Sequence, residues 1–370
     1  MKKIGREVAF LATSTKNPRN GEGSFLRLLD GRIMYAYTEY YGDSWEDHAT
    51  ARLSAVFSSD EGESWSHPSV LIEKDEDTLN IMSVSLFRMA NGDMGCLYLR
   101  KFLSDGGILC LPYFTRSSDE GKSFGAPVCC IKRAGYYVVN NDRLVRLESG
   151  RLVFPAARHG EALEHLAPGE IYICYSDDDG ATWQTSNRPV RSPYDDPKQL
   201  QEPGVFELPD GRLWLYTRTA YGHQYQAFSC DGGASFGAVT PAFRFTSPDA
   251  PMHVKRVGDI TLAIFNPIGY HPLRTKTEVW GSPKRTPYVC AVSRDGGRSF
   301  VEGAVTAADG GFRDFAASCY YLEDDREESY CYPAVLPVAG GFLVAYYHSG
   351  GTDVSLNCNR ITKVLYEELQ

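Results

Sequence analysis

The sequence predicts an all-β fold, a six-bladed β-propeller of four-stranded antiparallel sheets. An eight-residue pattern, Ser-x-Asp-x-Gly-x-(Ser/Thr)-(Phe/Trp), occurs five times at intervals of 53 to 64 residues. A second pattern, two apolar strands around a tight turn, occurs six times. Repeats with a period of this order are typical of propellers, in which each repeat forms one unit that packs on its neighbours. Residues 1–370 are therefore predicted to form a single domain.

The five octets are predicted to be structural turns on the outer rim of the ring. Their Asp accepts hydrogen bonds from backbone N–H groups downstream, their Gly adopts a positive φ, and their final aromatic ring packs between sheets. Each octet follows an apolar, β-rich run, so it joins the last two strands of a sheet. The five aspartates, which we do not expect to be catalytic, are Asp60, Asp119, Asp178, Asp231 and Asp295.

The six hairpins supply the inner strands of the ring, as their alternating apolar residues and Gly-containing turns indicate. They span residues 25–37, 86–99, 144–156, 205–217, 254–265 and 334–347. No octet follows the sixth hairpin, and residues 355–369 offer only one further strand. Residues 3–13 offer the missing strand. We therefore expect the N-terminal strand to pair with the last sheet, which closes the ring and hides both sheet edges.

Composition and charge exclude several classes of partner and location. The net charge of −9 and the lack of a basic run argue against nucleic acid. The sequence contains no run of 18 apolar residues, so it predicts no membrane-spanning helix. The first 20 residues show no signal peptide, and the ten cysteines show neither a disulfide framework nor a zinc spacing. We expect a cytoplasmic protein with reduced thiols, no metal and no cofactor, and the oligomeric state stays open.

A candidate site lies where the inner strands begin, because these positions converge on one face of the ring around the channel. The stretches just before the six hairpins are rich in polar and aromatic residues, which is unusual for the start of buried strands. They are residues 20–24, 80–85, 136–142, 201–204, 247–251 and 329–333.

With these features the chain resembles the sialidase superfamily, six-bladed propellers with Asp-box (BNR) repeats, and it is similar to a divergent bacterial-type member. The resemblance covers nearly the whole length, and its best local match is QEPGVFELPDGRLWLYTRT, residues 201–219. It implies that Glu202 is the base partner of a tyrosine nucleophile. It also implies that Arg218 is one of three arginines that bind the carboxylate of the substrate.

The resemblance indicates two further site residues less tightly. The segment Arg285-Thr286-Pro287 resembles the one that carries the third arginine, with Arg274 as the alternative. The nucleophile begins the sixth inner strand, where SYCYP offers Tyr330 and Tyr332. Counting back from Leu336 favours Tyr330, whereas matching Tyr-Pro to the Glu-Pro of the 201–219 segment favours Tyr332, which we prefer.

The chain also departs from the superfamily pattern. The Phe-Arg-Ile-Pro motif that supplies the first arginine is absent, and its position holds Glu22, so a carboxylate is expected where a guanidinium would be. The residues that could substitute are Arg19, Arg100, Lys101 and Arg158. The acid–base aspartate belongs to the loop after the first hairpin, where the candidates are Asp43 and Asp47.

These residues predict a glycoside hydrolase that removes a terminal acidic sugar from a carbohydrate. A neutral Tyr beside Glu suits a substrate with a carboxylate at the anomeric carbon, which would repel a carboxylate nucleophile. Arginine binds such a carboxylate through two parallel hydrogen bonds. Further substrate-binding candidates are Asn141, Gln201, Asp249 and His159. The alternative is a propeller that binds glycans without cleaving them, or a glycosidase for another sugar that uses His159 or Glu22.

Overall fold

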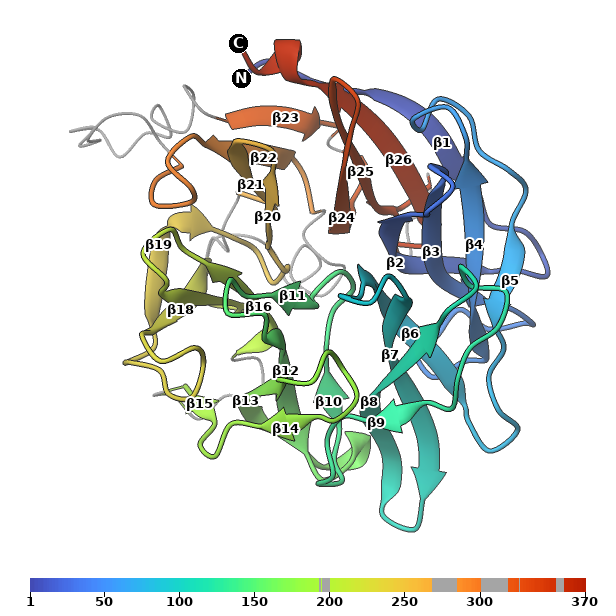
Figure 1. Ribbon diagram of the computed structural model, residues 1–370, viewed down its shortest axis with the longest axis vertical. Helices are drawn as coiled ribbons and strands as arrows, with labels where there is room; N and C mark the ends of the chain where they lie inside the picture. The colour runs from blue at the N-terminus through green and yellow to red at the C-terminus, as the bar shows by residue number, and fades with distance from the viewer. Residues whose placement is uncertain (193, 195–199, 268–284, 301–318, 326, 351–355) are drawn as a thin grey trace.

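The computed structural model describes residues 1–192, 194, 200–267, 285–300, 319–325, 327–350 and 356–370. Seen down its shortest axis, the molecule is a ring of sheets whose inner strands surround a central axis (Figure 1), and the region around this axis is called the channel. In the described residues the chain forms 26 strands and two short 3-10 helices, η1 (Leu163–His165) and η2 (Tyr366–Leu369). No helix among them is long and apolar enough to cross a membrane. The predicted all-β propeller is confirmed.

The strands group into five hydrogen-bonded sheets, which we number in chain order. The first sheet has eight strands: β2 (Arg19–Arg27), β3 (Ile33–Tyr40), β4 (Ala51–Ser58), β5 (Ser69–Ile72), β6 (Asn80–Arg88), β7 (Met94–Ser104), β8 (Gly107–Ser117) and β9 (Val128–Cys129). The second sheet has six strands: β10 (Tyr137–Val138), β11 (Val145–Arg146), β12 (Leu152–Gly160), β13 (Leu166–Ser176), β14 (Gln184–Thr185) and β15 (Val190–Arg191).

The other three sheets have four strands each. The third contains β16 (Gln201–Glu207), β17 (Leu213–Arg218), β18 (His223–Ser229) and β19 (Thr240–Thr246). The fourth contains β20 (His253–Val257), β21 (Ile260–Phe265), β22 (Tyr288–Ser293) and β23 (Cys319–Glu323). The fifth contains β24 (Tyr330–Val338), β25 (Gly341–His348), β26 (Cys358–Leu365) and β1 (Arg6–Leu11).

The prediction of six separate four-stranded sheets is therefore met only in part. The first eight strands form one continuous sheet because a single parallel pair, Ala51 with Asn80, joins β4 to β6. In the second sheet the inner and outer strands are broken into short pieces, β10 and β11 on one side of β12–β13 and β14 and β15 on the other. Both departures change the hydrogen bonding only locally, and the other strand pairs of these two sheets are antiparallel.

The N-terminal strand closes the ring, as predicted. Strand β1 pairs antiparallel with β26, so the last sheet contains both ends of the chain. The two termini lie side by side on the outer edge of the ring (Figure 1). Because β1 covers the free edge of β26, the sheet does not expose that row of backbone groups to another chain.

The octets form the predicted turns. In the first, the Asp60 carboxylate accepts hydrogen bonds from the Ser58 hydroxyl at 2.8 Å and from the Ser64 N–H at 2.9 Å. The hydroxyl of Ser58 in turn accepts the Gly62 N–H at 2.9 Å, and Gly62 has φ +85°. The same set of bonds recurs around the other four aspartates: Asp119, Asp178, Asp231 and Asp295.

Aromatic residues from the octets fill the spaces between sheets. The ring centroid of Trp183 lies 5.3 Å from that of Phe114 in the first sheet and 5.2 Å from that of Phe154 in the second. Phe300 occupies a similar place against Trp214 and Phe245 of the third sheet. Burial of such large apolar side chains is a major source of stability, so the core is a series of layers between sheets.

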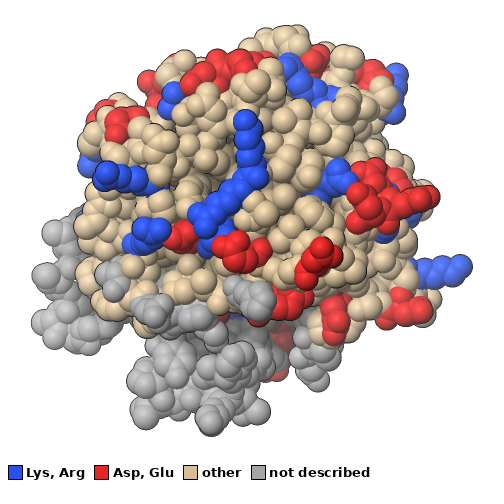
Figure 2. All heavy atoms as spheres, turned by 90° about the horizontal axis from the view of Figure 1, so that it is seen from below, with Lys and Arg blue, Asp and Glu red and all other residues tan. Residues whose placement is uncertain are grey.

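The surface carries both signs of charge. On the side of the molecule seen in Figure 2, Lys and Arg side chains lie among Asp and Glu side chains. All ten cysteines are free thiols, and eight of them are buried.

Candidate functional site

The starts of four inner strands share a backbone irregularity that aims side chains at the channel. In β2, β6, β16 and β24 the register of pairing with the next strand shifts by one residue close to the start of the strand, as at a β-bulge. The bulge residues Ser83, Glu202 and Tyr332 have φ of 57°, 47° and 57°. A positive φ is rare in residues with a Cβ, and it persists where the surrounding structure holds it. These positions therefore carry local strain at the mouth of the channel.

Two of these bulge residues meet across the channel. The Tyr332 hydroxyl donates a hydrogen bond to Glu202 Oε1 at 2.7 Å. The Arg218 Nη1 donates to Glu202 Oε2 at 2.7 Å and lies 3.5 Å from the Tyr332 oxygen. Residues Gln201 and Arg218 are direct partners across β16 and β17, which is why a spacing of one hairpin brings Glu202 and Arg218 together. The three predicted residues thus form one cluster.

Two more predicted residues complete this cluster. The Arg218 Nε donates to Asp249 Oδ1 at 2.6 Å, and the Asp249 carbonyl accepts from Arg285 Nη2 at 2.9 Å. The Arg285 guanidinium lies 5.6 Å from the centroid of the Tyr332 ring, on its face. The alternative to Arg285, Arg274, lies outside the described residues. Two cationic and two anionic side chains therefore surround one tyrosine.

Burial fixes the protonation states in this cluster. Desolvation, followed by the charge of Glu202, raises the pKa of Tyr332 well above its usual value, so its hydroxyl is neutral and available to donate. Burial lowers the pKa of Arg218, but the charges of Glu202 and Asp249 outweigh it, and the net shift is upward. Arg218 accordingly stays charged, and a neutral tyrosine sits between a carboxylate and two guanidinium groups.

The structure distinguishes the two tyrosines of the SYCYP segment. Tyr330 is 1 % exposed and stacks on His348 with 5.2 Å between ring centroids, on the other side of the strand. Tyr332 is the residue that contacts Glu202. A bulge followed by proline occurs at Glu202 and again at Tyr332, so the match of Tyr-Pro to Glu-Pro points to the tyrosine that contacts Glu202, whereas counting from Leu336 points to the one that stacks on His348.

The first inner strand differs from the prediction. The bulge there consists of Gly21 and Glu22, and in this register Gly21 is the counterpart of Glu202 and Tyr332. A Cβ at Gly21 would lie 2.7 Å from Thr38 Cβ and 3.0 Å from the Tyr347 hydroxyl, so only glycine fits. Glu22 is 4 % exposed, and its carboxylate accepts a hydrogen bond from Ser83. The position of the absent arginine therefore carries no side chain, and the carboxylate of Glu22 is engaged beside it.

Arg19 supplies a cation near this gap. Its Nε donates to the Tyr347 hydroxyl at 3.0 Å, and its guanidinium lies 4.6 Å from the centroid of the Tyr40 ring. The Tyr347 ring contacts the Tyr332 ring edge to face at 5.4 Å. Arg19 is thereby linked to the Tyr332 cluster through one aromatic residue.

The loop after the first hairpin brings Asp47 to Arg19. Asp47 Oδ1 lies 2.5 Å from Arg19 Nη1, and its side chain is 61 % exposed. Desolvation raises the pKa of Asp47, but Arg19 and Lys101 outweigh it and lower the pKa to about 2. Asp47 is consequently ionised at neutral pH. The other candidate, Asp43, lies exposed in the same loop.

His159 belongs to the neighbourhood of the cluster. It is 6 % exposed, and its Nδ1 lies 3.3 Å from the Ala167 carbonyl. Among the described residues its Nε2 has no hydrogen-bond partner. Desolvation lowers its pKa, and the charges of Glu202 and Arg218 also act on it, so the neutral ring lies close to both. A neutral imidazole with a free nitrogen can accept or donate one hydrogen bond to a ligand.

Three predicted residues have other partners. The Asn141 Nδ2 donates to the Gly23 carbonyl at 2.7 Å and is 1 % exposed, so this amide holds two inner strands together. Gln201 pairs through its backbone with Arg218. Arg100 pairs with Asp75, with 2.5 Å between Nη2 and Oδ2, away from the Tyr332 cluster. Arg100 therefore does not replace the missing arginine.

Lys101, the residue after Arg100, lies on the channel side instead. It is 3 % exposed, its Nζ donates to the Asp47 carbonyl at 2.8 Å, and it lies 5.8 Å from the centroid of the Tyr136 ring. Tyr347 and Tyr136 are the aromatic residues that sequence reasoning did not single out as site residues. The alternation of strand β7 could have separated Arg100 from Lys101, but only the folded loops show which one faces the channel.

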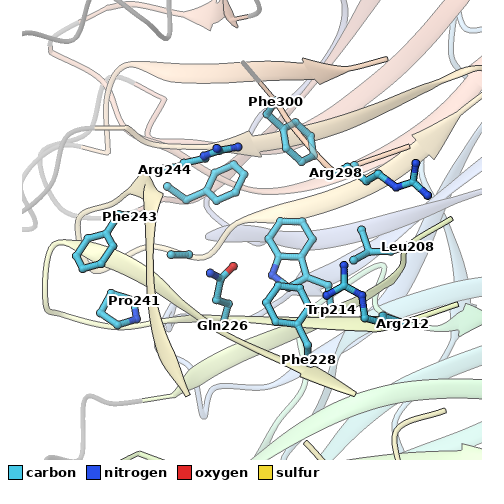
Figure 3. A pocket seen from close by; sticks show the side chains of 13 residues that line it. Leu208, Arg212, Trp214, Gln226, Phe228, Pro241, Phe243, Arg244, Arg298 and Phe300 are labelled. Carbon is cyan, nitrogen blue, oxygen red and sulfur yellow. The ribbon is translucent and has the colours of Figure 1, made fainter. Parts of the chain in front are cut away.

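A separate cavity of about 550 Å³ lies on the rim between the third and fourth sheets (Figure 3). Apolar rings line it, with Trp214, Phe228 and Phe300 among them, and three arginines stand at its edges. It contains none of the residues of the Tyr332 cluster. The described residues of its lining include no carboxylate and no nucleophile, so we place the candidate catalytic site at the channel mouth.

Comparison with known proteins places the chain in a family. Residues 86–345 match the BNR repeat-like domain family. No curated protein matches the sequence. The match and the similar structures below confirm the predicted resemblance to the sialidase superfamily.

Solved structures show the same fold at low identity. A protein of unknown function from Dyadobacter fermentans has a TM-score of 0.67 at 20 % identity and covers 97 % of this chain and 99 % of its own. The intramolecular trans-sialidase from Ruminococcus gnavus has a TM-score of 0.69 at 13 % identity and covers 98 % and 97 %. A mutant of the NanB sialidase from Streptococcus pneumoniae has a TM-score of 0.69 at 13 % identity and covers 100 % and 71 %.

Proposed function

The chain belongs to the family of BNR repeat-like domains, and on that premise we propose that it is a glycoside hydrolase that removes a terminal acidic sugar. The observation that carries this proposal is the 2.7 Å hydrogen bond from the neutral Tyr332 hydroxyl to Glu202. We also count the eight-stranded sheet as two blades, since only one residue pair joins its halves, which makes a six-bladed ring. Residues 1–370 then form one domain.

Tyr332 is the nucleophile in this proposal, and Glu202 is its base. The Tyr332 oxygen attacks the anomeric carbon as its proton passes to Glu202 Oε1, and the bond from that carbon to the leaving oxygen breaks. Water then attacks the same carbon and gives a proton to the carboxylate of Asp47, the bond to Tyr332 breaks, and Glu202 returns its proton to the Tyr332 oxygen. The strained backbone at both residues keeps them in contact before substrate arrives.

The two arginines support an acidic sugar as the substrate. Arg218 is balanced by Glu202 and Asp249, whereas the guanidinium of Arg285 has one hydrogen bond among the described residues, to a backbone carbonyl. Arg285 can accordingly offer donors to a substrate carboxylate beside the Tyr332 ring. The substrates of the neighbouring sialidase structures agree with this class, and the neutral tyrosine avoids repulsion from that carboxylate.

The leaving oxygen also needs a proton donor. Asp47 stands where the superfamily has its acid, but its pKa of about 2 leaves it ionised at neutral pH while it pairs with Arg19. The neutral His159 is the alternative donor on the other side of Glu202 and Arg218. We propose that a bound substrate displaces Asp47 from Arg19, that the released carboxylate takes up a proton from water, and that Asp47 passes this proton to the leaving oxygen.

Fluorophore release from a panel of aryl glycosides tests the proposal. The panel contains a sialoside, uronides and neutral sugars, and each is offered to the wild type and to Glu202→Gln. We expect cleavage of an acidic glycoside that is lost in the variant. Cleavage of neutral sugars alone would contradict the acidic substrate.

A second candidate function is glycan binding without cleavage. Gly21 in place of the first arginine and the ionised Asp47 favour it, because both weaken the machinery for hydrolysis. This function predicts no turnover across the panel, together with binding of an acidic sugar that Arg285→Gln abolishes.

A further inference from the structure

A second cavity, of about 470 Å³ and lined by several charged residues, lies beside the channel mouth, over the second sheet. Three arginines, Arg133, Arg158 and Arg191, line it together with Glu170. Ala167 forms part of its wall, and the Ala167 carbonyl is also the contact of His159 Nδ1. His159 lies close to Glu202 and Arg218, so it is a neighbour of both the Tyr332 cluster and this cavity.

The charges in the cavity do not cancel. Glu170 pairs with Arg191, with 2.5 Å between Oε1 and Nη2, and lies 3.9 Å from Arg158 Nη1. Glu161 lies 2.5 Å from Arg158 Nη2 and 3.7 Å from Arg133 Nη2, and its side chain is 73 % exposed. Three guanidinium groups thus share two carboxylates, one of which is mostly in solvent and can be displaced by another anion.

Arg158 is the buried member of this set. It is 6 % exposed, so its charge has been taken out of water. Among the described residues its Nε has no hydrogen-bond partner, and its Nη2 makes no hydrogen bond of good geometry. A buried guanidinium with unsatisfied donors is costly unless an acceptor reaches it. Gly135 packs against it, and a Cβ there would lie 2.8 Å from Arg158 Nε.

We propose that this cavity binds an anionic group, a sulfate or phosphate ester or a carboxylate, on the part of a glycan next to the sugar held at Tyr332. Three planar guanidinium groups around one cavity are suited to an oxyanion, because each can offer two parallel donors. The anion takes the place of Glu161 beside Arg158 Nη2 and accepts from Arg158 Nε, which has no partner among the described residues. Anion binding stands on the cavity alone, and its part in substrate choice rests on the proposed function.

Calorimetric titration with glucose 6-sulfate, and with glucose as its neutral match, tests the proposal on the full chain. Arg158→Gln and the exposed Arg191→Gln each remove one cation from the cavity. Arg151→Gln is the matched control, since Arg151 pairs with Asp177 outside the cavity. Glu202→Gln is included because the titration needs no turnover, so loss of cleavage does not affect it.

We expect glucose 6-sulfate to bind at least about tenfold more tightly than glucose, the size of a charge-assisted hydrogen bond. Each cavity variant should weaken the sulfated sugar by at least about tenfold, while Arg151→Gln and Glu202→Gln leave it within about twofold. If Arg158→Gln does not fold, Arg191→Gln alone decides. Equal binding of both sugars overturns the proposal. So does loss of sulfate binding in Arg285→Gln with full binding in Arg191→Gln, which would place the anion at the channel mouth.

Discussion

The outer rim and the channel mouth of this propeller both hold carboxylates in tight hydrogen-bonded turns, but only the rim repeats its arrangement. Each octet aspartate accepts from the same Ser hydroxyl and the same downstream N–H. Hydrogen bonds from Ser64 and Ser58 lower the pKa of Asp60 to about 2, and those of the other octets act alike. At the mouth, the equivalent bulge positions carry Gly21, Ser83, Glu202 and Tyr332, four different residue types.

This difference indicates that the rim serves the stability of the fold and the mouth serves function. A group that recurs in every repeat with the same bonds serves the repeat itself, whereas a position whose backbone recurs and whose side chain changes is free to carry chemistry. The rim should therefore respond to substitution in stability and the mouth in activity. Four predictions test that separation, in order of decreasing effect.

The largest effect is expected at Tyr332. Tyr332→Phe removes the nucleophilic oxygen and should lower kcat on a cleaved glycoside by at least about 1,000-fold, with a melting temperature close to that of the wild type. Tyr330→Phe is the matched control and should stay within a few-fold, because Tyr330 stacks on His348 away from Glu202. Equal losses in the two variants would mean that the mouth contributes no nucleophile.

A smaller effect is expected at Arg285. Arg285→Gln should lower kcat/KM for an acidic glycoside by about 10- to 100-fold, because a charge-assisted hydrogen bond is lost, and should leave a neutral glycoside unaffected. Arg100→Gln, whose partner Asp75 lies away from the cluster, serves as control. A uniform loss on acidic and neutral substrates would assign Arg285 a structural role.

On the rim, Asp178→Asn should lower the free energy of unfolding by about 1 to 2 kcal/mol, because the turn loses acceptor capacity for Thr182 and Ser176. Among the described residues its neighbour Asp177 pairs with Arg151 at the surface, so Asp177→Asn should change stability by less than about 0.5 kcal/mol. Denaturant titration compares the two. A loss of kcat in Asp178→Asn without a loss of stability would break the separation.

The smallest effect concerns pH and the channel interior. His253 is 3 % exposed, and burial together with the charge of Arg143 lowers its pKa to about 4 although Asp142 acts in the opposite direction. In the unfolded chain this histidine takes up a proton as the pH falls below about 6.5, whereas in the folded chain it stays neutral until the pH falls to about 4. Stability should therefore fall as the pH falls through this window.

Denaturant titration at several pH values measures this fall. His253→Gln should flatten it, and the exposed His67→Gln should not. Asp142, whose pKa is lowered chiefly by Lys255 and His253 against the effect of burial, contributes stability that is lost only at still lower pH. An unchanged slope in His253→Gln would show that this histidine does not control the pH response.

Much of the fold follows from the sequence, because octets and hairpins are local signals that repeat. Ring closure by β1 also follows, since one strand is missing at one end of the chain and one is spare at the other. The merging of the first two units does not, because it depends on a single backbone pair, Ala51 with Asn80, set by the path of a loop.

The family resemblance names Glu202, Arg218 and Tyr332 as candidates, and strand register explains why they lie together. Gln201 and Arg218 are partners across one hairpin, and Glu202 and Tyr332 are both bulge residues followed by proline. The pairing of Arg19, the first residue of β2, with Asp47 in the loop after β3 joins residues that are 28 apart in the sequence, so no local pattern predicts it. The same holds for the choice of Lys101 over Arg100, which only the packed neighbours decide.

Labelling of the nucleophile is the most direct test of the central claim that Tyr332 performs covalent catalysis with Glu202. The protein is incubated with a fluorinated glycosyl fluoride of the sugar that the panel identifies, which slows release of the enzyme-bound sugar, and its peptides are mapped by mass spectrometry. We predict one added sugar on the peptide that contains Tyr332, and none in Tyr332→Phe. A label on Glu22, His159 or another residue, or rapid cleavage with no labelled peptide, would contradict it.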